Sequence, residues 1–353
     1  METKILVLNL GSTSSKIAIN FDNQCVFYEN LKHDMALTSL PLSEQEGKRL
    51  EEIHARIRTE GYDLHHFDGI ACRGGLVKPI EGGVYHVTKE MVADLSSFKY
   101  GSHASNLSAM TGYTLGNMYG VPVYTLDPPV TDEFIPISRV TGIKGVARKS
   151  VYHALNQKAV ARMYAKSVNR PYDEINVIVA HMGGGTTVGA HLKGKVVDVN
   201  DGLLGEGPMS PERAGSVPND ALYQYGFERQ MSPKDFNHFL SRKTGFISLC
   251  GSNDVESICR EMDQNAEYKL AVDSCIYQVS KAIGERSISL KGQVDQIILT
   301  GGLAYNTYIT DEIKRYVDWI APVTIYAGEK EMDALATRVY DLFIDHEEAK
   351  DYR

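Results

Sequence analysis

The sequence predicts an α/β fold built from two related domains, and three observations carry this prediction. A segment made of an apolar strand, a Gly/Ser/Thr turn and a second β-prone run occurs twice, at residues 5–19 and 177–191. Predicted strands alternate with predicted helices, as is typical of layered α/β proteins. The chain has 353 residues, enough for two domains with full cores. The repeat suggests two facing domains, each presenting a polar hairpin tip to a nucleotide phosphate in a cleft.

The predicted strands are short runs of aliphatic and β-branched residues bounded by turn residues. Two of the turns, Asp22-Asn23 and Lys193-Gly194, have the composition of tight hairpins. The predicted strands span residues 4–9, 14–21, 67–72, 121–126, 175–181, 186–192, 195–199, 294–300 and 322–327.

The first long predicted helix spans residues 43–60. Ser43 with a Glu three positions later forms a capping box, and apolar residues follow at helical spacing until Gly61 ends the pattern. The other predicted helices span residues 103–119, 151–168, 233–243, 269–290, 308–318 and 331–346.

The Pro-rich stretch that begins at Asp127 closes a strand and is the predicted domain boundary. We expect an N-terminal domain at residues 1–128 and a C-terminal domain at residues 129–331. The last helix, at about 332–353, is expected to return to the first domain.

Composition narrows the function classes. The net charge is −8 and no Lys/Arg-rich run occurs, which argues against a nucleic-acid partner. The five cysteines include no Cys-x-x-Cys pair, so neither a disulfide framework nor a zinc site is expected. No apolar stretch approaches the roughly 18 residues that span a membrane. A cytoplasmic protein is the expectation.

The first hairpin, residues 9–16, combines groups that suit a phosphate. Gly11 permits a tight turn, Ser12 and Ser14 supply hydroxyls, and Lys16 supplies a positive charge. Asn9, at the strand end, could hold a metal-bound water. The alternative is an ordinary hairpin with a polar tip, and the second copy of the segment favours phosphate binding.

The second hairpin places His181 where the first has Asn9, followed by three consecutive glycines. This is neither a Walker A sequence nor a dinucleotide-binding loop. Three glycines let a phosphate lie against backbone amides, although a loop needed only for packing is the alternative. Another glycine turn follows the strand at 294–300 and could hold adenosine or the α-phosphate, or be a structural turn. The glycine-turn residues are Gly183, Gly184, Gly185, Thr300, Gly301 and Gly302.

Five further residues stand at strand ends, helix starts or Gly-rich loops. Arg73, beside two glycines, is expected to be an exposed guanidinium on a flexible turn, and Arg213 lies in a loop rich in Pro and Gly. Asp127 ends a strand and suits acid–base or metal chemistry. His103 opens a predicted helix, whose N-terminus would favour an anion and keep the imidazole neutral. His153 opens the next long predicted helix. Singly, either arginine is more often a surface salt bridge and each of the others is weak evidence; together they indicate a phosphate site.

In order along the chain, these residues resemble the motifs of the acetokinase family, within the acetate and sugar kinase, Hsc70 and actin superfamily. The motifs are Asn-x-Gly-Ser-Thr-Ser-x-Lys at 9–16, Arg-Gly-Gly-Leu at 73–76, Gly-Gly-Val-Tyr at 82–85, His-Ala-Ser-Asn-Leu at 103–107, the run from His153 to Arg162, Ala-His-x-Gly-Gly-Gly at 180–185, Gly-Glu-Gly-Pro-x-Ser-Pro-Glu-Arg at 205–213 and Leu-Thr-Gly-Gly-Leu-Ala-Tyr at 299–305. Acetate kinases carry His-Gly-Gly in place of the Arg73 motif and His-Gly-Thr-Ser-His in place of 153–157. Both differences favour the butyrate kinases of the family.

The resemblance implies duplicated actin-like (ribonuclease H-like) domains with a nucleotide cleft between them. It implies reversible, Mg²⁺-dependent transfer of phosphate from ATP to butyrate or a related short or branched-chain fatty acid, and ATP formation from butyryl phosphate. It assigns catalysis to Asp127, His153, Arg213 and His103. It assigns nucleotide binding to Asn9, Ser12, Ser14, Lys16, His181, Gly183, Gly184, Gly185, Asp254, Thr300, Gly301 and Gly302. It assigns the substrate pocket to Arg73, Cys72, Ser102, Tyr152 and Leu204, and the metal to Asn9 and Glu331, with Glu329 as the alternative to Glu331.

The arginine that contacts the carboxylate in acetate kinases does not transfer, because Ile70 stands at its position. Arg73 could substitute for it. The alternatives are an acetate, propionate, branched-chain fatty acid or sugar kinase of the same fold, or an actin-like ATPase module without an acyl acceptor. The expected partners are a small carboxylate and a nucleotide, with neither nucleic acid nor membrane, and a homo-oligomer of two or more copies is expected.

Overall fold

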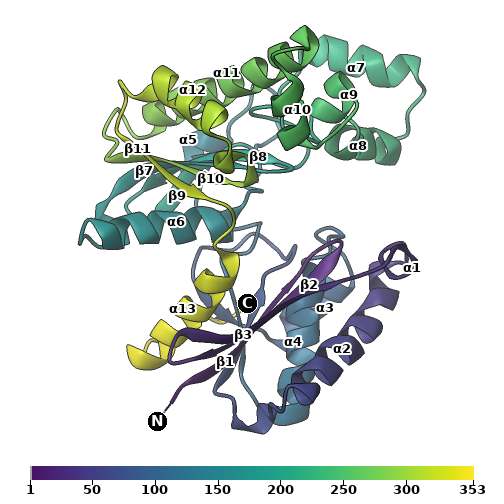
Figure 1. Ribbon diagram of the computed structural model, residues 1–353, viewed down its shortest axis with the longest axis vertical. Helices are drawn as coiled ribbons and strands as arrows, with labels where there is room; N and C mark the ends of the chain where they lie inside the picture. Colours follow the sequence, from purple (N-terminus) through teal and green to yellow (C-terminus); the bar gives the residue numbers. More distant parts are fainter. Residues whose placement is uncertain (1) are drawn as a thin grey trace. The chain divides into compact units, whose positions relative to one another are not determined.

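The computed structural model describes residues 2–353, which divide into two compact units (Figure 1). Unit 1 comprises the chain up to Thr131 together with Lys330–Arg353, and unit 2 comprises Asp132–Glu329. Each unit contains one β-sheet with helices packed on it. Within the described residues, no helix is both long and apolar enough to cross a membrane.

The sheet of unit 1 has the strand order β3-β2-β1-β4-β6-β5. β1 pairs antiparallel with β2 and parallel with β4, and β4 pairs parallel with β6. The strands are β1 (Lys4–Leu10), β2 (Ser14–Phe21), β3 (Gln24–Lys32), β4 (Gly69–Arg73), β5 (Val84–His86) and β6 (Val123–Leu126).

The sheet of unit 2 has the order β11-β10-β7-β8-β9. β7 pairs antiparallel with β8 and parallel with β10, and β10 pairs parallel with β11. The strands are β7 (Asn176–Met182), β8 (Thr186–Leu192), β9 (Lys195–Val199), β10 (Gln296–Gly301) and β11 (Val323–Ala327).

The two sheets repeat one topology, which supports the duplication inferred from the sequence. The order β3-β2-β1-β4-β6 and the order β9-β8-β7-β10-β11 match strand by strand in sequence and direction. The first hairpin turns between Leu10 and Ser14, and the second turns between Met182 and Thr186. The predicted α/β fold is confirmed.

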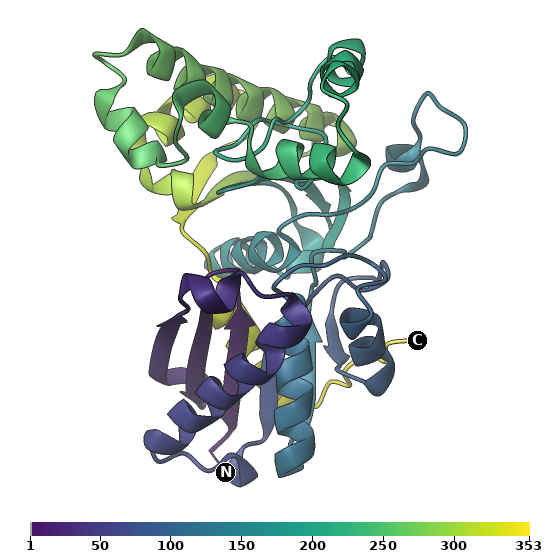
Figure 2. The same ribbon diagram turned by 90° about the vertical axis from the view of Figure 1, so that its right-hand side faces the viewer.

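Helices cover both faces of the first sheet. The helices α2 and α4 lie side by side along one face, and α13 packs on β1, β4 and β6 (Figures 1 and 2). The helices of unit 1 are α1 (Met35–Thr38), α2 (Leu42–Thr59), α3 (Lys89–Ser96), α4 (Asn106–Tyr119), α13 (Glu331–Ile344) and the 3-10 turn Leu64–His66.

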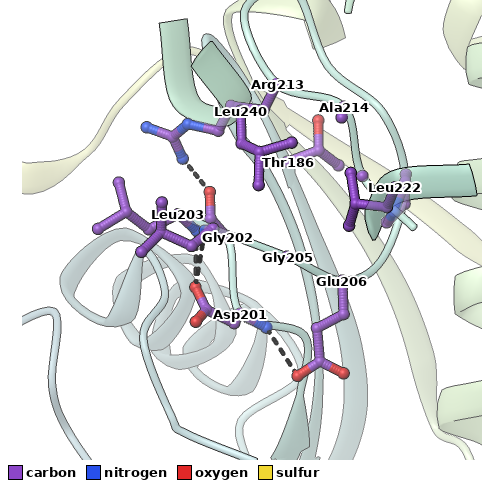
Figure 3. A pocket seen from close by; sticks show the side chains of 13 residues that line it. Thr186, Asp201, Gly202, Leu203, Gly205, Glu206, Arg213, Ala214, Leu222 and Leu240 are labelled. Atoms are coloured by element: carbon purple, nitrogen blue, oxygen red, sulfur yellow. Dashed lines mark hydrogen bonds between the residues drawn. The ribbon is translucent and has the colours of Figure 1, made fainter. Parts of the chain in front are cut away.

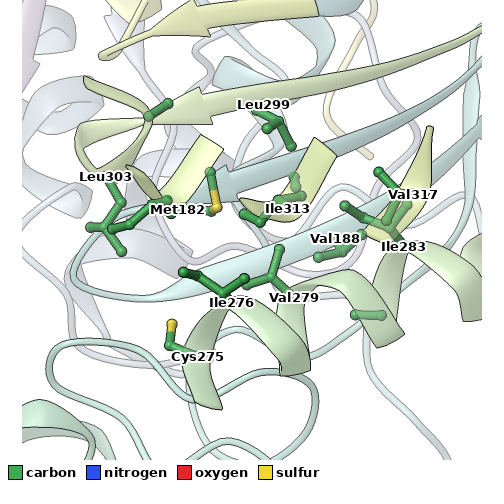
Figure 4. Packing of buried hydrophobic residues seen from close by; sticks show 14 of the residues in the cluster. Met182, Val188, Cys275, Ile276, Val279, Ile283, Leu299, Leu303, Ile313 and Val317 are labelled. Carbon is green, nitrogen blue, oxygen red and sulfur yellow. The ribbon is translucent and has the colours of Figure 1, made fainter. Parts of the chain in front are cut away.

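In unit 2, α6 packs on β7 and β10, while α11 packs on β7, β8 and β9. Ile276, Val279 and Ile283 of α11 point toward the sheet and form the main apolar core together with Val188 and Leu299 (Figure 4). The helices are α5 (Pro136–Arg139), α6 (Ala154–Ser167), α7 (Asn219–Glu228), α8 (Pro233–Arg242), α9 (Phe246–Cys250), α10 (Val255–Glu261), α11 (Ala266–Ser289), α12 (Thr307–Val317) and the 3-10 turns Tyr172–Glu174 and Gly302–Tyr305.

Some local predictions are wrong. The capping box at Ser43 does not form, because α2 already begins at Leu42 after Pro41, and no side chain caps it. β3 was missed because it is an edge strand, exposed or half-buried throughout, so its sequence lacks a buried apolar pattern. α7 was missed for the same reason, since it buries none of its residues.

The packing of α4 on the first sheet predicts opposite effects for two Gly→Ala substitutions. A methyl group at Gly112 would overlap the Cys72 sulfur and lie 3.2 Å from Val123 Cγ1, whereas one at Gly47 in α2 would meet no atom within 4 Å. Gly112→Ala should lower the free energy of unfolding by about 1–3 kcal/mol. Gly47→Ala should raise it by roughly 0.5–1 kcal/mol, because alanine favours the helix. Urea unfolding would measure both, and a shift in the same direction would contradict this packing.

Candidate active site

The tip of the first hairpin rests on a buried arginine that the sequence analysis missed. Arg49 of α2 is fully buried and donates to the carbonyl oxygens of Gly11 (2.7 Å) and Ser12 (3.3 Å) and to Gln45 Oε1 (2.8 Å). Burial lowers the pKa of Arg49. Arg49 lies four residues before Ile53, on the stripe of the helix that packs inward, and this position was the available signal.

The hairpin tip itself is short and exposed. The amide of Gly11 donates to the carbonyl of Ser14 (2.8 Å), Ser12 is exposed, and Ser14 is half-buried. Lys16 stands opposite Asn9 in the β1–β2 register. The tip therefore has hydroxyls at its surface and the Arg49 cation beneath its backbone.

Asn9, Arg73 and Glu331 form a polar cluster at the end of β1. Asn9 and Glu331 are each 3% exposed, and Asn9 Nδ2 donates to Glu331 Oε2 (2.8 Å). A nitrogen of the Arg73 guanidinium lies 3.3 Å from Asn9 Oδ1 and 3.4 Å from Glu331 Oε2. Parallel pairing sets Leu8 opposite Cys72, so the residues that follow, Asn9 and Arg73, emerge side by side. The prediction of an exposed Arg73 on a flexible turn is wrong, because this residue ends β4 and is paired.

Asn9 and Glu331 fit a magnesium ion in their chemistry. They bring together a side-chain amide, whose oxygen faces Arg73, and a carboxylate. Mg²⁺ commonly takes only one or two protein carboxylates and completes its shell with water and phosphate oxygens. Arg73 already compensates the same carboxylate, so a metal ion would share it. Among the described residues, no group of three or more His, Cys, Asp or Glu side chains is placed to hold a metal ion.

Asp127 and His103 are both held by backbone amides of unit 1. Asp127 follows β6, is fully buried, has a φ of 40°, and accepts a hydrogen bond from Gly83 N (2.9 Å). His103 Nδ1 accepts from Ser105 N (3.2 Å), which leaves the hydrogen of a neutral ring on Nε2. His103 does not open α4, which begins at Asn106, because residues 103–105 form a turn that precedes it.

Two predicted pocket residues of unit 1 lie in different surroundings. Cys72 is fully buried, packs against Gly112, and has its thiol pKa raised by burial. It is a core side chain. Ser102 is exposed in the loop before α4.

In unit 2, the glycine turn at 183–185 is tied to the loop that carries Arg213. The carbonyl of Gly184 accepts from Ser210 Oγ (2.7 Å) and from Glu212 N (3.3 Å). A side chain at Gly185 would overlap the Arg213 guanidinium. The glycine at 185 is therefore required by the close approach of this arginine.

The Arg213 guanidinium donates to the carbonyl of Gly202, in a turn that Asp201 closes (Figure 3). The Asp201 carboxylate accepts from Leu203 N (2.8 Å) and Leu204 N (3.3 Å), and burial raises its pKa. Burial also lowers the pKa of Arg213, and nearby Arg242 adds to the effect. Leu204, a predicted pocket residue, is 36% exposed on this turn.

A small cavity of about 20 Å³ lies beside Arg213 and is lined by Thr186, Asp201 and Leu204 among others. Its volume suits one water molecule. Thr186 Oγ1 and Arg213 Nε are buried without a hydrogen-bond partner among the described residues.

A larger pocket of about 700 Å³ brings together four predicted nucleotide-binding residues: Gly183, Gly184, Asp254 and Gly302. The Asp254 carboxylate caps α10, and its hydrogen bonds from Ser257 lower its pKa, so it stays ionised. The remaining lining residues are Pro211, Glu212, Asn253, Val255, Glu256, Leu303, Tyr305 and Asn306.

Two other residues of the third glycine motif do not line this pocket. Thr300 is fully buried, accepts from Asn156 Nδ2 (3.1 Å) and donates to the carbonyl of Gly328 (3.0 Å). Gly301 has a φ of 88°, and a side chain there would overlap the backbone of Met182. Their environments are those of structural residues.

His153 and His181 stack on each other, with ring centroids 3.8 Å apart and planes at 10°. His153 is the N-cap residue of α6, and its Nδ1 lies 2.9 Å from Thr187 Oγ1. His181 Nδ1 accepts from Asn156 Nδ2 (2.8 Å). Tyr152, the remaining predicted pocket residue, is 4% exposed in a cluster with Phe134 and Val196.

Comparison with known proteins gives one family and one fold. The model of the acetokinase family matches residues 135–350. A crystal structure of acetate kinase from Porphyromonas gingivalis is similar over 96% of this chain and 100% of that one, with a TM-score of 0.78 and 18% identity. A propionate kinase from Francisella tularensis is similar over 95% of this chain and 98% of that one, with a TM-score of 0.74 and 17% identity. An acetate kinase from Entamoeba histolytica is similar over 95% of this chain and 98% of that one, with a TM-score of 0.74 and 15% identity. These likenesses confirm the predicted actin-like fold class.

The contact between Gly185 and Arg213 predicts a strongly non-additive pair of substitutions. Gly185→Ala should lower the free energy of unfolding by about 1–3 kcal/mol, because the methyl group must displace the guanidinium. In an Arg213→Ala background the same change should cost much less, since the obstructing group is gone. Urea unfolding of the four proteins would measure this coupling. Gly205→Ala, where a methyl group meets no atom within 4 Å, is the control, and additive effects would contradict the contact.

Proposed function

Because the chain belongs to the acetokinase family, we propose that this carboxylate kinase transfers the γ-phosphoryl group of ATP to a short-chain fatty acid, giving an acyl phosphate and ADP. The observation that carries this proposal is the pocket of unit 2. Two glycine turns, at 183–184 and at 302, line it, and the half-buried Arg213 guanidinium lies against the adjoining Gly185. Such a pocket suits a nucleotide with its phosphates beside a fixed positive charge.

The reaction needs little acid–base chemistry. A carboxylate is ionised at neutral pH and can attack directly. Its oxygen forms a bond to the γ-phosphorus while the bond to the bridging oxygen breaks, and ADP leaves with that electron pair. Catalysis is then mostly positioning and charge compensation.

In the proposal, different residues of this chain position the reactants and compensate the charge of the transferring group. Arg213 supplies a cation and His153 a neutral donor to the transferring group, and Lys16 and His103 assist. Asp127, held by Gly83, orients the reactants. Asn9 and Glu331 hold Mg²⁺, which when bound neutralises phosphate charge. Arg73 keeps Glu331 in place, and it remains the candidate for contacting the substrate carboxylate.

The length of the acyl chain that the enzyme prefers is the more specific part of the proposal. The three similar solved structures described above are acetate and propionate kinases, which favours a substrate as short as acetate or propionate. Arg73 in place of histidine, and the small Ser102, favour butyrate or a branched acid. One methylene group changes specificity by only about 1–3 kcal/mol, so we expect several acids to compete. The expected homo-oligomer stays a prediction.

A substrate panel tests the function. The purified protein with ATP, Mg²⁺ and acetate, propionate, butyrate or isobutyrate should form an acyl phosphate that hydroxylamine traps as a hydroxamate. Specificity constants would rank the acids. A sugar-dependent reaction, or ATP hydrolysis without hydroxamate from any acid, would overturn the proposal.

Two substitutions test the assigned catalytic groups. Asp127→Asn and Arg213→Ala should each lower kcat by about 100- to 1,000-fold, as expected when a group that stabilises the transition state is lost. Arg229→Ala, at an exposed arginine that stacks on Tyr225, is the matched control and should leave kcat unchanged. Near wild-type activity in both variants would refute the assignment.

Glu331→Gln should raise the Mg²⁺ concentration needed for half-maximal activity by about tenfold or more, because the carboxylate would be lost. Glu329→Gln should leave that concentration unchanged. The measurement is a Mg²⁺ titration at saturating ATP and carboxylate. The reverse pattern would move the metal-linked role to Glu329.

A further inference from the structure

A chain of buried polar side chains in unit 2 leads from His153 into the core. His153, the N-cap residue of α6, lies one turn before Gln157, and Thr187 and His191 lie four residues apart on β8. Gln157, Thr187 and His191 are each fully buried. The proposed function uses only His153, so the other members have no assigned purpose.

The amide of Gln157 has only one orientation that fits its neighbours. Its Nε2 lies 3.0 Å from the carbonyl oxygen of Thr187, which can only accept, so the NH₂ group must face that side. The same nitrogen lies 2.8 Å from Thr187 Oγ1 and donates there too. The Oε1 atom then faces His191 Nε2 (3.1 Å) and fills the space left by the missing side chain of Gly189.

This orientation fixes the hydrogens along the whole chain. Thr187 Oγ1 accepts from Gln157, so its own hydrogen is directed to His153 Nδ1 at 2.9 Å. At the other end, His191 donates from Nε2 to Gln157 and accepts at Nδ1 from the Tyr172 hydroxyl (2.8 Å). Each link then has one donor and one acceptor. Reversing the link to His153 would leave the hydroxyl hydrogen of the buried Thr187 without an acceptor, which costs about 1–3 kcal/mol.

We propose that Gln157 is a positioning residue that holds His153 as the neutral tautomer with its hydrogen on Nε2. Gln157 acts through Thr187 and does not touch the substrate. The catalytic meaning of this tautomer rests on the proposed function, in which His153 donates to the transferring phosphoryl group. A lone pair at Nε2 would instead repel the phosphate oxygens.

The tautomer can be measured directly. In protein carrying ¹⁵N-labelled histidine, two-bond ¹H–¹⁵N correlation spectra show which ring nitrogen is protonated, and a His153→Gln variant identifies the signal. The expected result is a hydrogen on Nε2 and none on Nδ1. A hydrogen on Nδ1 of His153 in the wild-type protein would overturn the proposal by itself.

The Gln157→Glu variant tests whether Gln157 sets the tautomer of His153. The carboxylate has no hydrogen to give, so the Thr187 hydroxyl should turn toward it and accept from His153 Nδ1, which moves a hydrogen to that nitrogen. Thr187→Val removes the link and should give a mixture of tautomers. Gln296→Glu is the matched control, since Gln296 is also buried in unit 2 but bonds to Thr324. An unchanged His153 signal in both Gln157→Glu and Thr187→Val would overturn the proposal.

Kinetics separate the positioning role from the proposed function. Gln157→Glu should lower kcat by about 10- to 100-fold, less than complete loss of a transition-state donor, with KM for ATP and carboxylate changed less than about threefold. A changed tautomer with unchanged kcat would support the positioning role and remove His153 from the catalytic assignment. Because the spectra need no turnover, they decide the proposal even if no acyl phosphate forms.

Discussion

A carboxylate buried at the end of the first strand constrains the whole of unit 1. Glu331 is 3% exposed, and an ion so buried costs several kcal/mol unless hydrogen bonds and opposite charge compensate it. Asn9 and Arg73 provide that compensation from two neighbouring parallel strands. The last helix must therefore return to the strand that begins the chain, where Asn9 and Glu331 are the residues proposed to hold Mg²⁺.

The duplicated sheets show how one topology carries two chemically different hairpin tips. Both hairpins turn over three residues at equivalent positions, but Lys16 in the first corresponds to the fully buried Val188 in the second. The first hairpin is supported from below by Arg49, which donates to its carbonyl oxygens. The second is closed by Arg213, which occupies the space that Gly185 leaves. In each copy an arginine lies against a glycine-containing turn, fully buried in the first copy and half-buried in the second.

The sequence predicted what depends on local pattern. Strands with buried apolar residues and long helices are predicted correctly because their periodicity is strong. Close packing is not visible in the sequence, as the opposite effects expected at Gly112 and Gly47 illustrate. Whether Gly112 touches the sheet depends on Cys72, forty residues away. Arg73 was expected to be exposed because its partner Glu331 lies at the other end of the chain. Gln157 stood in a recognised motif, yet its role depends on the hydrogen-bonding direction at Thr187, which only the fold brings into contact.

In the proposed reaction, a carboxylate oxygen of the substrate forms a bond to the γ-phosphorus of ATP. The most direct measurement uses butyrate or propionate labelled with ¹⁸O in both carboxyl positions, followed by ³¹P NMR of the products. We expect an acyl phosphate whose phosphorus signal shows the isotope shift of one bridging ¹⁸O atom. ADP and unlabelled inorganic phosphate, with no labelled acyl phosphate, would contradict it and indicate ATP hydrolysis alone.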